Sequence, residues 1–180
     1  PLAGIPGVVV HGSNDRIGPR PVNPFRYLLS PTEAIHSGTA LDFEGLQGLY
    51  DELGWVDINN AVATYTIRGS ELECVGLGDA HAGEDATYTM PQWLESAREN
   101  RTNSRERDAR SITTIGVTHA PYRRVLNALV TNGAELIMAG HTHGGQVCVP
   151  GIGALTTNCD LPTKQARGLS LWQHQRRASY

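Results

Sequence analysis

The sequence predicts an α/β fold, and three stretches of the chain support this prediction. Residues 7–11 are a β-branched run bounded by glycine, which is typical of a buried strand. Residues 61–77 alternate between apolar and polar side chains on either side of a Gly69-Ser70 turn, which predicts a β-hairpin. Residues 112–140 combine a strand, a helix and a second strand at the spacing of a right-handed crossover, which would place two parallel strands side by side.

Composition is that of one globular domain. The 180 residues suffice to bury a substantial core, and 39% are hydrophobic against 18% charged. Fifteen Lys and Arg residues against 18 Asp and Glu residues give a net charge of −3, which is too mild to indicate a nucleic-acid partner. No stretch has the length and apolarity of a membrane-spanning helix. Cys74, Cys148 and Cys159 lack metal-type spacing, so we expect reduced structural thiols.

Three segments carry helix signals. Asp42 is the predicted N-cap of the first helix, Gly54 is its predicted end, and the apolar stripe between them should pack in the core. A proline in the first turn predicts a second helix over residues 92–99. The third, over residues 122–130, carries four apolar side chains that should point inward. The two apolar stripes are Leu46, Leu49, Tyr50 and Leu53 in the first helix and Val125, Leu126, Leu129 and Val130 in the third.

Two polar segments show no periodicity. Residues 16–38 contain four prolines and predict a long loop, in which Arg20 is equally consistent with a phosphate contact and with a solvated surface position. Residues 98–110 contain five arginines among polar residues, and we expect a mobile, solvated connector.

The main functional signal is Gly140-His141-Thr142-His143-Gly144-Gly145-Gln146, which follows a short apolar run at 135–139. Two histidines at i and i+2 on a glycine-rich turn direct their rings to one side. Neutral imidazole binds transition metals well, so the pair indicates a metal site. A lone His-x-His pair is more often two polar loop residues. Here His119 also ends a predicted strand, and the crossover would bring it beside the pair.

Four segments resemble motifs of the calcineurin-like metallophosphoesterases. Gly140–Gln146 resembles the family signature Gly-His-[Thr/Ser]-His-Gly-Gly-Gln. The other three, in family order, are Gly12-Ser13-Asn14-Asp15, Gly76–His81 and Gly116-Val117-Thr118-His119. The likeness runs from about residue 7 to Trp172. We therefore assign residues 1–172 to the C-terminal part of a metallophosphoesterase domain and expect residues 173–180 to be a frayed tail.

The resemblance implies a sandwich of two packed mixed β-sheets flanked by helices, present here as an incomplete domain. Two family motifs, Asp-x-His and Gly-Asp-x-x-Asp, have no counterpart in the chain. Because the chain opens on Pro1, we infer an internal fragment of a longer protein, with processing to Pro1 as the rival explanation. The missing strands would leave an open sheet edge and exposed apolar surface.

The resemblance also implies hydrolysis of a phosphate mono- or diester at a dinuclear centre of divalent transition-metal ions, Mn, Zn or Fe, with metal-activated water. His119 and His141 match ligands of one ion, and His143 matches a ligand of the other. The bridging carboxylate of the family has no counterpart here. Since two close dications then repel each other without compensation, we expect the 180 residues alone to bind at most one ion, weakly, and to turn over poorly.

The loop Gly12–Asp15 resembles the family's Gly-Asn-His-Asp but departs from it. Ser13 falls on the asparagine that binds a metal, and Asn14 falls on the histidine that assists the leaving group. We expect Asn14 to reach the metal through a one-residue shift of the loop, which leaves the histidine role vacant. Asp15 matches the carboxylate that orients that histidine. Asn14 and Asp15 are therefore the predicted catalytic residues, and Asn14 is also a predicted metal ligand.

Asp79-Ala80-His81 resembles a Gly-x-Asp-Asp-[Pro/Ala]-His loop that lies beside the site in one subfamily. Asp-x-His is also the first metal motif of the family, but that motif precedes Gly-Asn-His-Asp, whereas this segment follows its counterpart. We therefore predict that Asp79 and His81 lie outside the direct metal ligands, facing substrate together with Arg20. A structural hydrogen-bonding role fits Asp79 and His81 equally well.

The sequence leaves the substrate open among a nucleotide, a lipid headgroup and a phosphoprotein. No nucleic-acid partner is expected, and membrane association or targeting would depend on sequence upstream of Pro1, so cytoplasmic and membrane-peripheral locations both stay open. The main rival function is a degenerate, non-catalytic phosphoesterase fold that serves as a binding or scaffolding module. A mononuclear zinc protein is a weaker third alternative.

Overall fold

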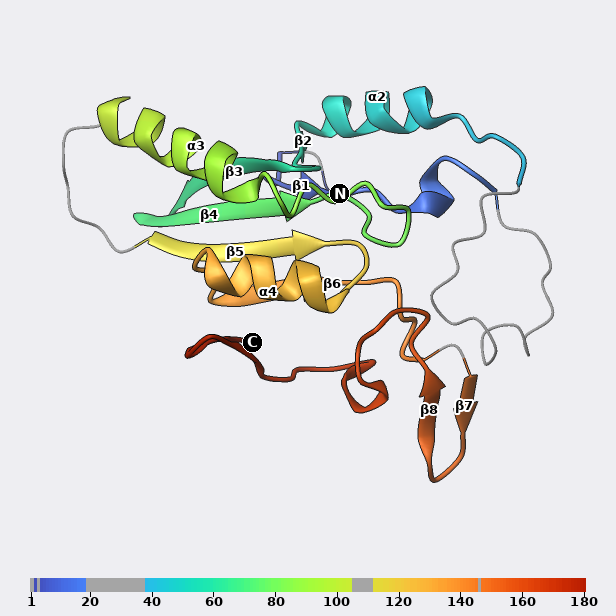
Figure 1. Ribbon diagram of the computed structural model, residues 1–180. Coiled ribbons are helices and arrows are strands. Elements are labelled where there is room, and N and C mark those ends of the chain that lie inside the picture. The colour runs from blue at the N-terminus through green and yellow to red at the C-terminus, as the bar shows by residue number, and fades with distance from the viewer. Residues whose placement is uncertain (1, 3, 19–37, 105–111, 146) are drawn as a thin grey trace.

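A computed structural model describes residues 2, 4–18, 38–104, 112–145 and 147–180. Within these ranges the protein is mixed α/β, with three α-helices and four small sheets (Figure 1). The largest sheet has four strands in the order β3-β4-β5-β6. Its strands are β3 (Ala61–Ile67), β4 (Ser70–Leu77), β5 (Ile112–Thr118) and β6 (Leu136–Ala139).

Local sequence signals explain most of this sheet. Strands β3 and β4 form the predicted antiparallel hairpin. Its turn lies one residue earlier than predicted, at Arg68 (φ 51°) and Gly69 (φ 84°), and two positive φ values suit the twist of a tight hairpin. The parallel pair β5–β6 confirms the predicted crossover. The parallel pairing of β4 with β5 was not predicted, and it joins hairpin and crossover into one sheet.

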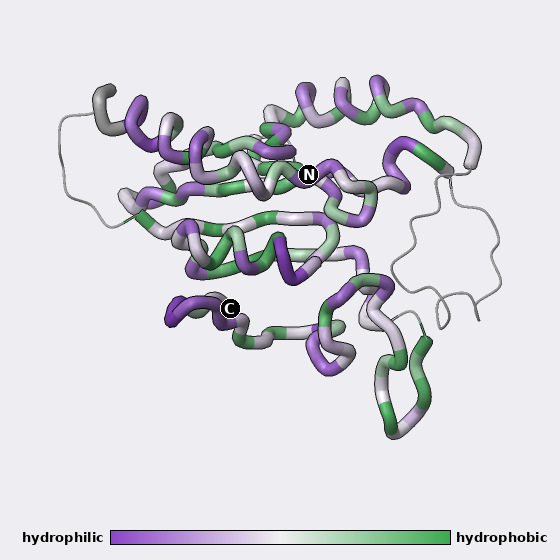
Figure 2. The backbone as a smooth tube through the Cα atoms, in the orientation of Figure 1, coloured by the Kyte–Doolittle hydropathy of each residue, from purple (hydrophilic) through white to green (hydrophobic). Residues whose placement is uncertain are grey.

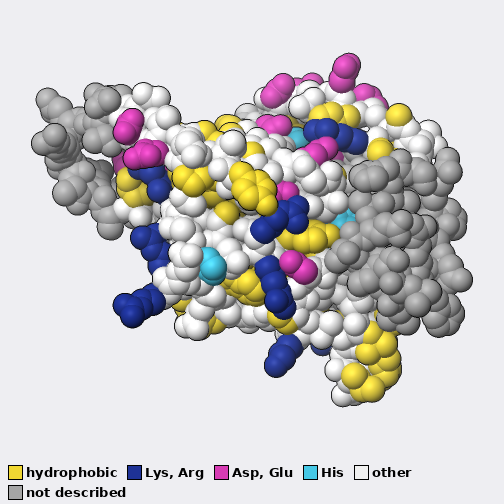
Figure 3. Space-filling view, viewed as in Figure 1, with side chains coloured by type: hydrophobic (Ala, Val, Ile, Leu, Met, Phe, Trp, Pro, Cys, Tyr) yellow, Lys and Arg dark blue, Asp and Glu magenta, His cyan; other side chains and the backbone are white. Residues whose placement is uncertain are grey.

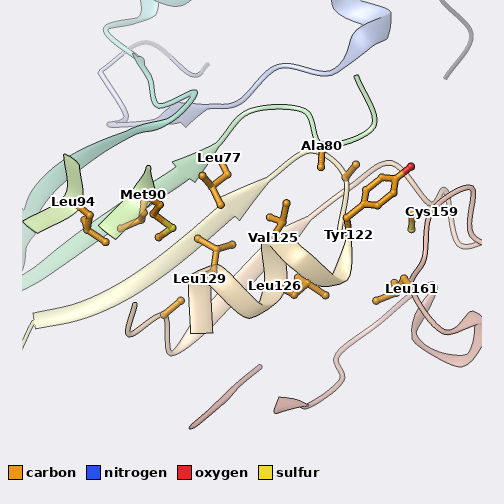
Figure 4. Close-up of a cluster of buried hydrophobic side chains, with 13 residues drawn as sticks. Leu77, Ala80, Met90, Leu94, Tyr122, Val125, Leu126, Leu129, Cys159 and Leu161 are labelled. Carbon is orange, nitrogen blue, oxygen red and sulfur yellow. The ribbon is translucent and has the colours of Figure 1, made fainter. Parts of the chain in front are cut away.

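Helices α3 (Met90–Ser104) and α4 (Arg123–Thr131) pack on one face of this sheet. Helix α3 is longer than the predicted 92–99, whereas α4 agrees with its prediction within a residue. All four apolar side chains predicted for α4 are buried. Figure 4 shows side chains of both helices meeting β4 in one cluster. Its largest members are Val75, Leu77, Met90, Leu94, Tyr122, Val125, Leu126, Leu129 and Leu161.

A buried carboxylate on the same face joins the sheet to α3. Glu73 is 1% exposed and accepts hydrogen bonds from Arg98 Nε at 3.1 Å and Arg101 Nη1 at 2.8 Å. Thr114 Oγ1 on β5 donates to the same carboxylate at 3.1 Å. Burial raises the pKa of Glu73, but the hydrogen bonds and positive charge of the two arginines outweigh burial and hold that pKa below its usual value. Glu73 is therefore ionised and paired.

The N-terminal elements form a two-stranded sheet that contacts the main sheet, since the Tyr65 hydroxyl of β3 donates to the Gly7 carbonyl at 2.9 Å. β1 (Val8–Val9) pairs in parallel with β2 (Val56–Asp57), and α2 (Phe43–Leu53) precedes β2. The predicted caps of α2 are confirmed, because Asp42 accepts from the Gly45 N–H at 2.9 Å and Gly54 ends the helix at φ 70°. The predicted core packing is wrong: no α2 residue is buried, and Leu49 in its apolar stripe is 50% exposed.

The C-terminal part contains two small antiparallel hairpins. The first is β7 (Val147–Val149) with β8 (Gly153–Thr156), followed by the short 3-10 helix η2 (Thr163–Gln165). The second is β9 (Trp172–His174) with β10 (Arg177–Ser179), where a frayed tail was expected. This second hairpin is anchored, because Trp172 Nε1 donates to Asn127 of α4 at 3.0 Å and the Ile137 N–H of β6 donates to the Tyr180 carbonyl at 2.6 Å.

The structure thus confirms the α/β class, while the packed two-sheet sandwich stays a prediction. Apolar side chains on the second face of the main sheet, such as Leu72, Ile115 and Val117, are only half-buried. No helix in the described ranges combines the length and apolarity needed to cross a bilayer. Arg20 and the connector residues 105–110 lie outside the described residues.

Candidate functional site

The parallel strands of the main sheet end in register at one edge. Leu77 of β4 pairs with Thr118 of β5, and Thr118 pairs with Ala139 of β6. The residues that follow these ends therefore meet at a common edge, as is typical of ligand sites in α/β sheets. From the three strands this edge receives Asp79 and His81, then His119, and finally His141.

His119 and His141 form the centre of the site. Nδ1 of His141 lies 3.3 Å from Nε2 of His119, and the two rings are nearly perpendicular at 75°. Nε2 of His141 lies 3.0 Å from the backbone oxygen of Asn158. Because a carbonyl only accepts hydrogen bonds, Nε2 of His141 must carry the proton. Nδ1 then keeps a lone pair, and this lone pair faces His119.

The electrostatic environment keeps His141 neutral. Burial, together with the neighbouring His81 and His119, lowers the pKa of His141 to about 4, even though the backbone hydrogen bond to Asn158 acts to raise it. A neutral imidazole held by a carbonyl through its second nitrogen is the usual arrangement of a metal ligand. Two nitrogens bound to one tetrahedral zinc at about 2.0–2.1 Å stand about 3.3 Å apart. The observed nitrogen separation is compatible with one shared ion, and equally with a hydrogen bond that His119 Nε2 donates to His141 Nδ1.

The turn that carries His141 and His143 is strained. His141 has φ 65° and His143 has φ 50°, in the left-handed region that costs a non-glycine residue about 1–2 kcal/mol. Glycine is required at Gly145, because its φ is 111° and an added Cβ would lie 2.3 Å from Cβ of Ala154 on β8. Thr142 Oγ1 donates to the Ala166 carbonyl at 2.7 Å. Packing thus holds His141 and His143 in a backbone conformation that is unfavourable for non-glycine residues, and such strain is common at functional sites.

The loop Gly12–Asp15 closes the site from the N-terminal side. A Cβ on Gly12 would lie 2.5 Å from the His119 ring, so that ring rests directly on the glycine backbone. Asp79 is 1% exposed and joins two loops, since Oδ2 accepts from the Ser13 N–H at 2.9 Å and Oδ1 accepts from the His81 N–H at 2.8 Å. This is the structural hydrogen-bonding role that the sequence left open for Asp79.

His81 lies closer to the histidine pair than its place in the sequence order suggested. Its ring centroid is 4.5 Å from that of His141, and its Nδ1 is 2.9 Å from the Tyr122 hydroxyl. Burial raises the pKa of Tyr122 to about 12, so this hydroxyl is protonated at neutral pH. His81 and Tyr122 place two further hydrogen-bonding groups beside His141. That His81 lies outside the direct metal ligands stays a prediction.

The remaining predicted site residues are spread around this cluster. Asn14 is exposed on the short 3-10 helix η1 (Ser13–Asp15), and Asp15 Oδ2 accepts from the Gly12 N–H at 2.8 Å. His143 is exposed, and within the described ranges neither Asn14 nor His143 contacts His119 or His141 by a hydrogen bond, ion pair or ring contact. The structure therefore brings together two of the three predicted histidines.

Two contributors to the site escaped the sequence analysis. Tyr122 directly follows the strand-end segment of His119, but no pattern marks it as a partner of His81. Asn158 contributes a backbone oxygen from a turn at φ 57°, and its side chain nitrogen lies 3.4 Å from Nε2 of His141. A backbone acceptor leaves no signal in the sequence. Among the described residues, no group of three or more His, Cys, Asp or Glu side chains is arranged to hold a metal ion.

Comparisons with known proteins found no matching family model, no matching curated protein and no matching solved structure.

Proposed function

We propose that the protein is a metal-dependent phosphoesterase, a hydrolase that cleaves a phosphate mono- or diester. The observation that carries this proposal is the 3.3 Å approach of His141 Nδ1 to His119 Nε2 at the sheet edge. Both histidines were predicted as ligands of one ion from strand-end position and motif resemblance. Their facing nitrogens have the spacing that one bound transition metal requires.

In this proposal His119 and His141 hold one divalent ion, with His143 and Asn14 as ligands on the second side. The complete centre would hold two ions, Mn, Zn or Fe, and its bridging carboxylate would belong to sequence outside these 180 residues. Bound metal would supply Lewis-acid activation of the phosphate and of the attacking water. His119 rests on Gly12, which fixes its ring. The Asn158 carbonyl fixes the tautomer of His141.

The other site residues orient loops and substrate. Asp79 holds the Ser13 and His81 backbones together, which keeps Gly12–Asp15 against the histidine pair. His81 and the protonated hydroxyl of Tyr122 stand beside His141, where they would meet oxygens of a bound phosphate ester. These groups position substrate by hydrogen bonds. Asp15 restrains its own loop by accepting the Gly12 N–H.

A second candidate is the non-catalytic binding module. It is favoured by the lack, among the described residues, of a third side chain that completes a metal site with His119 and His141. The strained His141–His143 turn weighs against it, because a scaffold gains nothing from a turn that costs conformational energy.

Zinc affinity tests the ligand assignment without requiring turnover. Competition against a weak chromophoric chelator should show weak binding of at most one zinc ion by the 180-residue chain. We expect His119→Ala and His141→Ala each to weaken it by at least about tenfold, since second-shell changes alone cost 10–100-fold. His174→Ala, on the distant strand β9, is the matched control and should bind normally. Equal zinc affinity in all four proteins would refute the ligand assignment.

Hydrolysis of bis(4-nitrophenyl) phosphate and 4-nitrophenyl phosphate tests the activity itself. A chain extended to include the Asp-x-His and Gly-Asp-x-x-Asp motifs should turn over with Mn²⁺ or Zn²⁺, and His141→Ala should abolish turnover. Asn14→Ala should reduce it strongly and Ser13→Ala only mildly. The 180 residues alone should stay near background. Zinc bound through His119 and His141 without hydrolysis of either ester would favour the binding module.

A further inference from the structure

Hairpin β7–β8 projects from the body of the protein (Figure 1), and its turn carries the apolar side chain of Ile152. Its main packing partner is η2. The turn is tight, with the Ile152 N–H donating to the Val149 carbonyl at 3.0 Å across Pro150-Gly151. Ile152 is 74% exposed and Leu155 on β8 is 43% exposed. Figure 2 colours much of this hairpin as hydrophobic, and Figure 3 shows hydrophobic side chains over its projecting end.

Two cationic side chains line a groove beside this hairpin. The groove has a volume of ≈ 820 Å³, and its lining includes Ile152 and Ala154 of the hairpin together with Lys164 and Arg167. Both cations are exposed. Arg167 also runs beside the histidine turn, since its Cδ lies 3.8 Å from the place of a Cβ on Gly144.

The charge balance of the C-terminal quarter differs from that of the whole chain. Residues 136–180 contain four cationic side chains and one carboxylate, a net +3, while the entire chain carries −3. The cations are Lys164, Arg167, Arg176 and Arg177. The single carboxylate, Asp160, accepts from the Arg123 N–H at 2.7 Å and is occupied within the fold. Arg176 and Arg177 lie on the β9–β10 hairpin, so Lys164 and Arg167 are the two exposed cations that line a groove with the apolar protrusion. Such a surface complements an anionic amphiphilic layer.

We infer that this surface, comprising Ile152, Leu155, Lys164 and Arg167 and called here the hairpin surface, docks on an anionic lipid bilayer. The apolar tip would enter the boundary between headgroups and acyl chains, and the two cations would bind lipid phosphates. Membrane association expected from the sequence would depend on residues upstream of Pro1, whereas this surface lies within the chain. The inference does not depend on the proposed hydrolysis, because docking requires neither metal nor turnover.

The groove also relates docking to the histidine turn. Gly144 of that turn lines the groove together with Arg167, so the groove adjoins the turn that carries His141 and His143. If the protein is a phosphoesterase, this placement favours a lipid headgroup over the nucleotide and phosphoprotein substrates that the sequence left open.

Vesicle co-sedimentation of the 180-residue chain tests the inference. Vesicles of phosphatidylcholine with one quarter phosphatidylglycerol should bind the protein, pure phosphatidylcholine should bind it far less, and 0.5 M NaCl should reduce binding. Lys164→Gln and Arg167→Gln should each lower the partition coefficient about fivefold, the usual effect of one basic residue near an anionic surface. Ile152→Ser should lower it about tenfold through lost apolar insertion.

Matched surface variants separate specific docking from general adhesion. Arg68→Gln in the β3–β4 turn removes an exposed cation, and Tyr88→Ser removes a side chain that is 90% exposed. Both should bind vesicles as the unmodified protein does. Losses equal to those of Lys164→Gln and Ile152→Ser would overturn the inference, as would equal binding to neutral and anionic vesicles. Binding of a monomeric short-chain phosphatidylglycerol without vesicle binding would also overturn it, in favour of a groove for a single amphiphile.

Discussion

Acidification should destabilise the metal-free chain through His141. The pKa of this histidine is about 4 in the folded protein, against 6.5 for an ordinary histidine. Between these values the unfolded chain binds a proton that the folded chain does not bind. Folding stability therefore rises with pH across this window and is lost as pH falls from 6.5 toward 4.

The magnitude follows from the size of this pKa difference. One pKa unit corresponds to about 1.4 kcal/mol, so the free energy of unfolding should fall by about 2 kcal/mol between pH 7 and pH 5 and by about 3 kcal/mol in total. Two carboxylates with shifted pKa values affect folding stability at lower pH than His141 does. Glu73 and Asp57 have pKa values below their usual ones, so the stability they contribute is present above the ordinary carboxylate range and is lost only at lower pH.

Urea unfolding followed by tryptophan fluorescence, with a chelator present, measures the effect at pH 7, 6 and 5. His141→Gln should flatten the pH dependence in this range, whatever it does to absolute stability, because it removes the titrating ring. His174→Gln on β9 should keep the full dependence. A loss between pH 7 and 5 that is equally large in His141→Gln would refute the reasoning. So would an NMR titration of the His141 ring with a midpoint near 6.5.

Two further substitutions test packing around the site and the core. Gly12→Ala should lower zinc affinity at least about tenfold, because the added Cβ would lie 2.5 Å from the His119 ring and displace this ligand. The control Gly48→Ala adds a Cβ with nothing within 4 Å, so it should leave zinc affinity unchanged in the same competition assay. Unchanged affinity in Gly12→Ala would contradict the contact. Glu73→Gln should lower the free energy of unfolding by about 3 kcal/mol in urea titrations, because it removes one partner of a buried ion-pair network. The exposed control Glu52→Gln should stay within about 0.5 kcal/mol, and equal losses in both would mean that the network adds no stability.

Local chemistry in the sequence determined where elements begin, end and turn. Asp42 and Gly54 marked both ends of α2, because a side-chain cap and a left-handed glycine act within one helical turn. The crossover over residues 112–140 was predictable for a related reason. Its strand, helix and strand each have their own periodicity, and chain connectivity then leaves essentially one parallel arrangement.

Burial depended on partners that local patterns cannot identify. The apolar stripe of α2 predicted core packing, yet Leu49 is half exposed, since a stripe shows what a helix can bury and not what lies opposite it. The polar tail predicted fraying, yet Trp172 and Tyr180 anchor it to α4 and β6. Both outcomes depend on contacts between residues far apart in the chain.

Within the candidate site, too, the sequence predicted some features and the tertiary structure decided the others. Strand-end position was enough to place His119 beside His141, because parallel strands end at one edge of the sheet. The tertiary structure decided which other groups join them. His143 is two residues from His141 but is exposed, because both backbones are in the left-handed region and the turn directs the two side chains differently. His81 and the Asn158 carbonyl reach His141 from distant loops whose positions are set by packing and by hydrogen bonds such as those of Asp79.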